Sequence, residues 1–273
     1  MKNICVVTGG GSGMGLAAAK IMGKDHSVIL VGRTVKKLEG ALQELLDLEI
    51  EAEVFPCDVS SRASVQELAS HAAKSGNVKA VINAAGMSPH MASGELIFDA
   101  NAMGTIYVNE EFSKVMKAGS CIVNVSSMSA YMMAEEKLPR SEYKVSLSDP
   151  EQFRAKMLAI LGTVPQEAAP NMAYMISKNF VIWYAAQCAC LYGSKGIRVL
   201  SVSPGTFNTP MGEIEGEEAA SFARRGALGR VGEVDEMARL IAFIAGDGAG
   251  YLTGTDILCD GGTIAAMRRS MEK

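Results

Sequence analysis

The feature that most constrains this sequence is a regular alternation of short apolar runs with longer amphipathic segments. The first run, at residues 3–8, is continuously apolar at its centre, as expected of a strand buried on both faces. Strands are predicted at residues 3–8, 27–31, 53–57, 78–83, 120–125, 197–202 and 256–258, and helices at 13–23, 34–48, 61–75, 95–117, 171–192 and 233–245. Because strands separated by helices form βαβ units, the sequence predicts an α/β fold with a parallel sheet covered on both faces.

The alternation runs through all 273 residues without a linker-like stretch. We therefore predict one doubly wound, Rossmann-type domain over residues 1–273. A formal net charge of −4 argues against a nucleic-acid partner, and no apolar stretch reaches the roughly 20 residues of a membrane span. The chain begins in a strand rather than a signal peptide, so we expect a cytoplasmic protein without membrane partners.

One segment, residues 131–170, breaks the alternation. It is rich in Met, Glu and Lys, and Asp149 followed by Pro150 is typical of a helix start, with Asp as the N-cap. The apolar residues that follow would share one helix face: Phe153, Met157, Ile160 and Leu161. A helical insertion is favoured here, because structureless loops of this length are unusual in compact domains.

A glycine-rich turn links the first strand to the first helix. The run is Thr8-Gly9-Gly10-Gly11-Ser12-Gly13-Met14-Gly15. Glycines allow a sharp turn and a close approach to a pyrophosphate, whose charge the N–H groups of the helix start can meet. The alternative is an ordinary glycine-rich loop, but a position at the first βα turn favours a dinucleotide.

Other short motifs follow in a defined order. Asp58 follows the third strand, Asn83-Ala84-Ala85-Gly86 ends the fourth, Ser126-Ser127 closes the fifth, Tyr174 and Lys178 lie on one helix, and Pro204-Gly205 follows the sixth strand. Together with the T-G-x-x-x-G-x-G spacing of the turn, this pattern resembles the short-chain dehydrogenase/reductase family from Lys2 to about Met267. The resemblance implies an oxidoreductase with a nicotinamide cofactor that interconverts a carbonyl and an alcohol.

The resemblance also implies which residues hold the cofactor. Those in the glycine-rich turn are Gly9, Gly11, Ser12, Gly13, Met14 and Gly15. Those near the adenosine are Arg33, Asp58 and Val59, and those after the fourth strand are Asn83, Ala84 and Gly86. The remaining ones are Tyr174 and Lys178, together with Pro204, Gly205 and Thr209 around the nicotinamide. The second strand ends in Gly32-Arg33, where NAD enzymes usually carry an acidic residue. A guanidinium suits the 2′-phosphate, so we expect NADP(H) rather than NAD(H), although Arg33 could also be a solvated surface residue.

Of the seven tyrosines, only Tyr174 is followed by a lysine four residues later, Lys178. On a helix this spacing places both side chains on one face. An ammonium about 5 Å from the phenol, at an effective dielectric constant of about 20, favours the phenolate by about 3 kcal/mol and lowers the pKa of the phenol. That interaction lowers the pKa of the phenol only part of the way to neutral pH. Full activation of Tyr174 is therefore expected to require bound cofactor. A surface Tyr–Lys pair is the alternative.

The resemblance supplies two further catalytic candidates. Ser127 matches the serine that holds the substrate oxygen, with Ser126 and Ser129 as less favoured substitutes. Asn101 matches the helix asparagine whose family role is to bind a water that links Lys178 to solvent; polar packing in mid-helix is the alternative. In reduction, the cofactor would deliver hydride to the carbonyl carbon while Tyr174 protonates the oxygen that Ser127 holds.

Ser127 and Tyr174 are 47 residues apart because of the insertion, which we expect to rim the substrate mouth. A comparable insertion occurs in bacterial 3α-hydroxysteroid dehydrogenase/carbonyl reductases, and the likeness favours a bulky apolar carbonyl or alcohol substrate. Met132, Met133 and a substrate loop at about residues 206–228 are candidates for lining the pocket, unless the methionines only pack the insertion. The insertion precedes the helix through which many relatives form tetramers. We therefore expect a homodimer, with a tetramer as the alternative.

Three other functions stay open. The first is reduction of a 3-oxoacyl thioester, a sugar or carbonyl compounds in general. The second is enoyl-thioester reduction, although its enzymes space the tyrosine and lysine further apart. The third is a non-catalytic NADP(H) sensor. No metal is expected, because the three histidines are isolated and the six cysteines lack ligand-like spacing.

Overall fold

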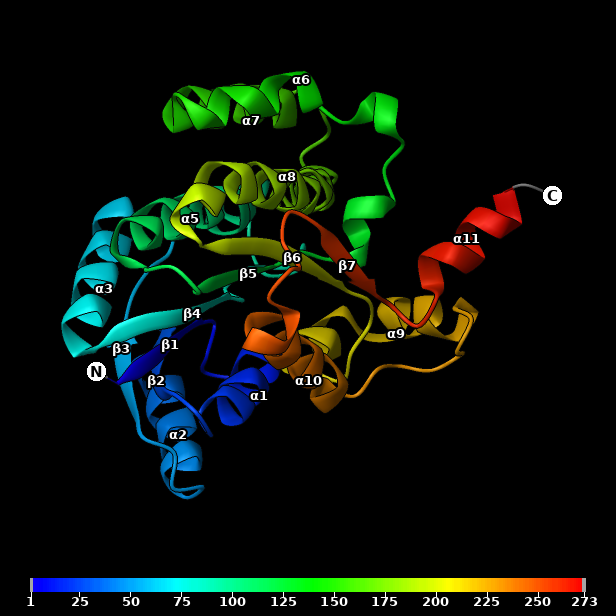
Figure 1. Cartoon of the computed structure of the whole chain (residues 1–273). Coiled ribbons are helices and arrows are strands. Elements are labelled where there is room, and N and C mark those ends of the chain that lie inside the picture. The colour runs from blue at the N-terminus through cyan, green and yellow to red at the C-terminus, as the bar shows by residue number, and fades with distance from the viewer. Residues whose placement is uncertain (1, 272–273) are drawn as a thin grey trace.

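The computed structural model describes residues 2–271, apart from the side chains of residues 215 and 218. Its centre is a seven-stranded sheet in the order β3-β2-β1-β4-β5-β6-β7, in which every neighbouring pair is parallel (Figure 1). The strands are β1 (Asn3–Thr8), β2 (Ser27–Gly32), β3 (Ala52–Pro56), β4 (Asn77–Asn83), β5 (Cys121–Val125), β6 (Arg198–Pro204) and β7 (Asp256–Cys259). The predicted doubly wound α/β fold is confirmed.

Helices cover both faces of the sheet. The α-helices are α1 (Gly13–Met22), α2 (Val35–Leu46), α3 (Arg62–Ser75), α4 (Gly94–Phe98), α5 (Gly104–Val115), α6 (Arg140–Tyr143), α7 (Pro150–Leu161), α8 (Ala169–Tyr192), α9 (Pro210–Arg225), α10 (Val234–Ala245) and α11 (Thr263–Met271). Short 3-10 helices are η2 (Met128–Tyr131), η3 (Glu135–Lys137), η4 (Lys144–Leu147), η5 (Gly193–Lys195) and η6 (Asp247–Ala249).

The strand residues divide between two cores, one on each face. Ile4 and Val6 of β1 join a cluster with α3, α5 and α8, whereas Cys5 and Val7 join a cluster with α1, α2 and α10. Successive side chains of a strand point to opposite faces, so a continuously apolar run can supply both cores. This is why the central strands carry no polar alternation.

A π-helical turn, η1 (Asp99–Met103), interrupts the long helix predicted over residues 95–117. The helix is instead α4, η1 and α5 in succession, and it ends at Val115. The backbone stays helical across both junctions, at Phe98 and at Gly104. Hydrophobic periodicity does not distinguish an α-helix from one that holds a single π turn, so the sequence pattern gave no sign of it.

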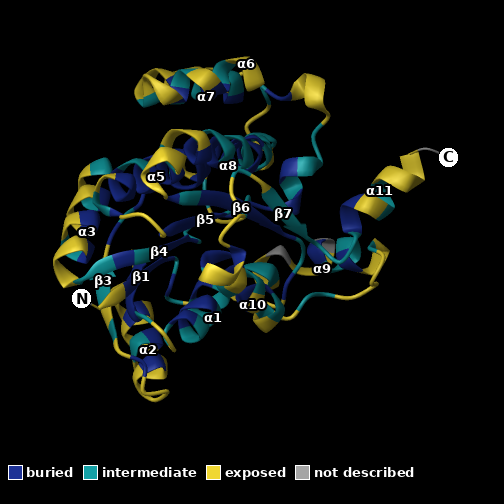
Figure 2. Cartoon of the chain, in the orientation of Figure 1, coloured by how far each residue is buried: buried dark blue, intermediate teal, exposed yellow. Residues whose placement is uncertain are grey.

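The insertion is helical, as predicted, and Asp149 caps α7 by accepting a hydrogen bond from the Gln152 amide. It lies over the outer face of α8, with exposed residues turned away from the body (Figure 2). Phe153, Met157 and Leu161 are buried, whereas Ile160 is only partly buried. These side chains continue an aromatic cluster formed by Phe98, Tyr143, Phe180, Trp183 and Tyr184.

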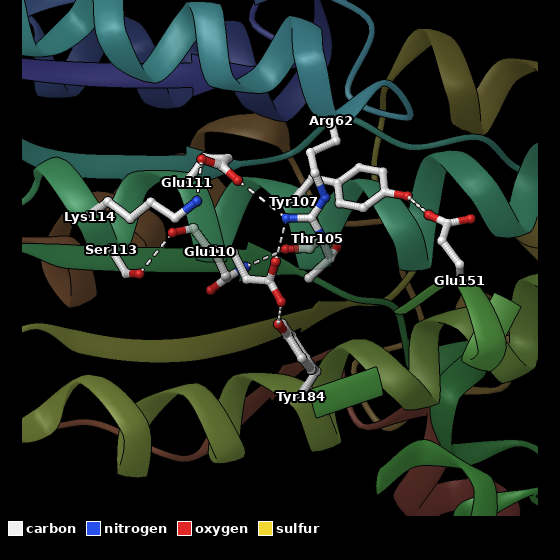
Figure 3. Close-up of polar contacts among 10 residues, drawn as sticks. Arg62, Thr105, Tyr107, Glu110, Glu111, Ser113, Lys114, Glu151 and Tyr184 are labelled. Carbon is white, nitrogen blue, oxygen red and sulfur yellow. Dashed lines mark hydrogen bonds and ion pairs between the residues drawn. The ribbon is translucent and has the colours of Figure 1, made fainter. Parts of the chain in front are cut away.

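Polar contacts fasten the first turn of α7 to the body (Figure 3). The Tyr107 hydroxyl of α5 donates to Glu151 Oε1 at 2.8 Å. Arg62 of α3 lies 4.5 Å from the Tyr107 ring centroid and donates to Glu110 at 2.6 Å. These contacts connect the insertion to α5, and α5 to α3.

Two helices were not predicted. The expected substrate loop at about residues 206–228 contains α9, which is kinked at Gly216 where φ is 59°. The segment after β7 forms α11. Among residues 2–271, no helix is long and apolar enough to cross a membrane, and no group of histidine, cysteine and carboxylate side chains is arranged to hold a metal ion.

Candidate active site

A cleft of about 600 Å³ opens at the carboxyl ends of β1, β4, β5 and β6. In open α/β sheets this edge, where strand order reverses between β1 and β4, is the usual place for a ligand. Thirteen predicted site residues line the cleft: Gly9, Ser12, Gly13, Met14, Gly15, Ala84, Gly86, Ser127, Tyr174, Lys178, Pro204, Gly205 and Thr209. Segments far apart in the chain thus meet in one cavity.

The glycine turn has the close packing that a dinucleotide site needs. Gly9 has φ of 68°, and a Cβ atom there would lie 2.8 Å from the Ala84 carbonyl oxygen. At Gly15 a Cβ atom would lie 2.5 Å from the Gly9 carbonyl oxygen. Ser12 precedes α1 and makes no capping hydrogen bond with its side chain, so the backbone N–H groups at this helix start are available to an anion. The turn therefore fits the pyrophosphate of a nicotinamide dinucleotide.

Near the turn the sequence analysis missed one cation, Lys37. It lines the cleft from the first turn of α2, and a Cβ atom at Gly11 would lie 3.4 Å from Lys37 Cβ. Arg33 is exposed and does not itself line the cleft. The signal in the sequence that could have identified Lys37 is its position four residues after Arg33, in the first turn of the following helix.

Four other predicted cofactor residues lie outside the cleft lining: Gly11, Asp58, Val59 and Asn83. Asp58 Oδ1 accepts from the amide and hydroxyl of Ser60, and Val59 is buried against α5. The Asn83 side chain is buried and accepts from Thr8 Oγ1 at 2.9 Å, which ties β4 to β1. For Asn83 the structure therefore shows a packing role, and any contact with the cofactor stays a prediction.

The catalytic candidates come together from β5 and α8. Lys178 is buried, and its Nζ donates to the Val125 carbonyl at 2.9 Å and lies 5.8 Å from the Tyr174 ring centroid. The Ser126 hydroxyl donates to the Lys178 carbonyl at 2.6 Å, so it is committed to joining β5 to α8. Ser127 precedes η2, and its Oγ accepts from the Ser129 amide at 3.2 Å while it faces the cleft.

Asn101 lies one layer behind the cleft, in the π turn, and is buried. Its Oδ1 accepts from the Met87 amide at 2.8 Å, and its Nδ2 donates to the Met87 carbonyl at 3.0 Å and to Ser177 Oγ at 3.3 Å. Ser177 lies between Tyr174 and Lys178 on α8. The side chain of Asn101 thus connects the loop after β4 to the helix that carries the Tyr–Lys pair.

The cleft is rich in methionine. Its apolar lining includes Met87, Met91, Met128, Met132, Met175, Met211, Phe207, Ile214 and Phe222. No carboxylate is present among the described side chains that line it. His90 and Asn171, which were not predicted from the sequence, also line the cleft.

The expectation that the insertion rims the substrate mouth is wrong for most of its length. Residues 133–170 contribute nothing to the cleft lining, and Met133 packs against the core instead. The reason is the apolar face of α7, whose Phe153 packs against Phe98 of α4 and Phe180 of α8 and so draws the helix away from the cleft. Of the insertion, only Met132 reaches the cleft, at the point where the chain leaves η2.

Comparison with known proteins is consistent with this geometry. The chain is 28% identical over 274 residues to the short-chain dehydrogenase/reductase bsc3 of Alternaria brassicicola, with 98% of each chain covered. It is 27% identical over 276 residues to the 3-alpha-hydroxysteroid dehydrogenase/carbonyl reductase of Comamonas testosteroni, covering 97% of this chain and 98% of the relative. A short-chain dehydrogenase from Burkholderia cenocepacia, solved in complex with NADP, shares the fold with a TM-score of 0.76 at 22% identity, covering 95% of this chain and 96% of that one.

Family models match both halves of the chain. A model described as "short chain dehydrogenase" covers residues 3–139, and one described as "Enoyl-(Acyl carrier protein) reductase" covers residues 151–263. The first alone spans just over half of the sequence. The chain therefore belongs to the short-chain dehydrogenase/reductase family and is an oxidoreductase that acts on alcohol or carbonyl groups.

Proposed function

We propose that the protein interconverts a ketone or aldehyde and the corresponding alcohol with NADP(H), on a bulky apolar substrate. The observation that carries the proposal is the shared cleft, into which Ser127, Tyr174 and Lys178 open beside the glycine turn. A carbonyl group placed there would meet a hydroxyl from β5 and a phenol from α8 on one side.

NADP(H) is proposed because the cations near the turn suit a 2′-phosphate. Arg33 follows Gly32, where a carboxylate would repel the phosphate, and Lys37 lines the cleft next to Gly11. The fold relative from Burkholderia cenocepacia was solved with NADP, which supports the same choice. When bound, the reduced nicotinamide supplies the hydride, and the oxidised form accepts it in the reverse direction.

The residues of the chain supply the proton and the orientation. Tyr174 donates a proton to the carbonyl oxygen, and Ser127 holds that oxygen by a hydrogen bond. Lys178, fixed by the Val125 carbonyl, favours the phenolate left on Tyr174. Asn101 keeps α8 aligned with the loop after β4.

A bulky apolar substrate such as a hydroxysteroid is proposed from the lining of the cleft. Methionine side chains adapt to irregular apolar ligands, and the described lining has no carboxylate to favour a cation. The Comamonas testosteroni relative is named for a hydroxysteroid, which points the same way. The i,i+4 spacing of Tyr174 and Lys178 favours carbonyl reduction over enoyl reduction.

Turnover of a panel of ketosteroids, aldehydes and 3-oxoacyl thioesters with NADPH tests the proposal. Tyr174→Phe should lower kcat by about 10²- to 10⁴-fold, because it removes the proton donor and leaves the ring in place. Tyr192→Phe, on the same helix but outside the cleft lining, is the matched control. Unchanged turnover by Tyr174→Phe would show that the catalytic assignment is wrong, and a preference for 3-oxoacyl thioesters would replace the proposed substrate class.

We also propose a homodimer. The outer face of α8 is covered by the insertion of the same chain, so that face is not available for pairing with another subunit. Light scattering should give the mass of two chains, and a tetramer would contradict the proposal.

A further inference from the structure

Arg154, on α7, reaches from the insertion to the start of the π turn. Its Nε and Nη2 donate to the two carboxylate oxygens of Asp99 at 2.6 and 2.7 Å, and Nη2 also donates to Glu95 Oε1 at 2.6 Å. A guanidinium fork on a carboxylate fixes direction as well as distance. Arg154 therefore joins two positions that lie on either side of the junction between α4 and η1.

This ion pair is partly withdrawn from water. The Asp99 side chain is 18% exposed and that of Arg154 is 30% exposed. The neighbouring residue Phe153 packs against Phe98, with ring centroids 5.6 Å apart. Ion pairs in full contact with water contribute little because solvent and salt screen them, whereas a forked, partly buried pair is screened less. The start of the π turn is thus held from outside by the insertion.

The inner side of the same turn presents Asn101 to the active site. Asn101 lies two residues after Asp99, and its side chain contacts Met87 and Ser177. Its carbonyl oxygen accepts from the Thr105 hydroxyl at 2.7 Å. A π turn is rare and occurs frequently at functional sites. Its wider ring shifts the residues that follow out of α-helical register. If the turn relaxed to an α-helix, Asn101 would rotate away from Met87 and Ser177.

We propose that Arg154 is a positioning residue for the active site: by clamping Asp99 and Glu95, it holds the π turn in the register that keeps Asn101 in contact with Met87 and Ser177. The inference rests on the proposed function, in which Tyr174 and Lys178, on either side of Ser177, are catalytic. It gives the insertion a role behind the catalytic helix in place of the expected role at the substrate mouth.

Arg154→Met and Lys156→Met form a matched pair of variants. Lys156 is on the same helix and makes an equally short ion pair, 2.6 Å to Glu142, but that pair stays within the insertion. Arg154→Met should lower kcat by about 10- to 100-fold, as misplaced catalytic groups do, with KM for NADPH unchanged. Lys156→Met should keep the kcat of the original protein. Arg154→Lys keeps the charge but loses the two-pronged contact with the Asp99 carboxylate, so its kcat should lie between those of Arg154→Met and Lys156→Met. It also serves as the test if Arg154→Met does not fold.

A second readout does not depend on activity. The Met87 amide donates to Asn101, so hydrogen exchange of that amide in the cofactor-free protein should be about tenfold faster in Arg154→Met than in Lys156→Met. Equal exchange and equal kcat in these two variants would overturn the role of Arg154. Tyr174→Phe separates the two hypotheses. If it abolishes turnover while Arg154→Met keeps the kcat and the Met87 exchange rate of Lys156→Met, only the role of Arg154 fails. Full turnover by Tyr174→Phe overturns the proposed function.

Discussion

Gly86 lines the cleft and lies close to both Asn101 and Lys178. A Cβ atom there would lie 2.8 Å from Asn101 Oδ1 and 3.4 Å from Lys178 Nζ. The first distance is shorter than real Cβ contacts allow, and Asn101 cannot withdraw without losing its bonds to Met87. Glycine is therefore required at position 86 because there is no room for a Cβ atom.

Gly86→Ala should consequently lower kcat by about 10- to 100-fold through displacement of Asn101 and Lys178, and should lower the free energy of unfolding by about 1–3 kcal/mol. Gly40→Ala is the control, because nothing lies within 4 Å of a Cβ atom there. That change should stabilise α2 by about 1 kcal/mol and leave kcat unchanged. Steady-state kinetics and denaturant unfolding of both variants make the comparison, and full activity of Gly86→Ala would contradict the crowding argument.

Single residues were predictable from the sequence where a local pattern fixes their place. Tyr174 and Lys178 share a helix face at any ordinary helix geometry, so their meeting follows from spacing alone. The partners of Asn101 depend on a π turn that periodicity does not reveal. Lys37 was missed because its approach to Gly11 depends on how α2 packs against the glycine turn.

At the scale of elements, the strands and most helices follow from apolar periodicity, whereas the docking of the insertion does not. The helix start at Asp149 and Pro150 was readable because capping is local. That α7 lies on the outer face of α8 follows from long-range contacts, such as Phe153 stacked on Phe180 with ring centroids 4.5 Å apart. An apolar helix face predicts burial without identifying the surface that covers it.

The packing of the insertion on the rest of the domain can be tested at the hydrogen bond between Tyr107 and Glu151 (Figure 3). Burial, followed by the hydrogen bond to Glu151, raises the pKa of Tyr107 to about 12. In the unfolded chain the phenol titrates near 10. The folded protein therefore holds this proton more tightly, so the stabilisation is complete below about pH 10 and is lost as the pH rises toward 12.

Tyr107→Phe keeps the ring under Arg62 but removes the hydroxyl, and should lower the free energy of unfolding by about 1 kcal/mol near pH 8. The difference from the original protein should shrink between about pH 10 and pH 12, since the original loses the same contribution there. Denaturant unfolding at several pH values measures it. A difference that stays constant across this range would show that the hydroxyl does not fasten the insertion.

At the scale of the whole molecule, the cleft joins both halves of the sheet. Its lining extends from Gly9, after β1, to Phe222 in α9, and includes residues that follow β4, β5 and β6. A ligand bound there contacts segments that meet only in the folded chain. Cofactor binding should therefore stabilise the entire domain, as expected for a ligand that binds the native state and not the unfolded chain.

This linkage gives a test of cofactor choice that needs no substrate. NADPH at about 100 times its Kd should stabilise the fold by about 2.7 kcal/mol and raise Tm by roughly 5–10 °C. NADH at the same concentration should raise Tm less, because it lacks the 2′-phosphate that Arg33 and Lys37 would meet. Replacing both cations, as Arg33→Ser with Lys37→Ser, should reduce the NADPH shift to that of NADH and leave the NADH shift unchanged. Equal Tm shifts with NADPH and NADH in the original protein would show that neither Arg33 nor Lys37 selects the 2′-phosphate. They would also show that the lack of a carboxylate at Gly32 does not by itself discriminate between the two cofactors.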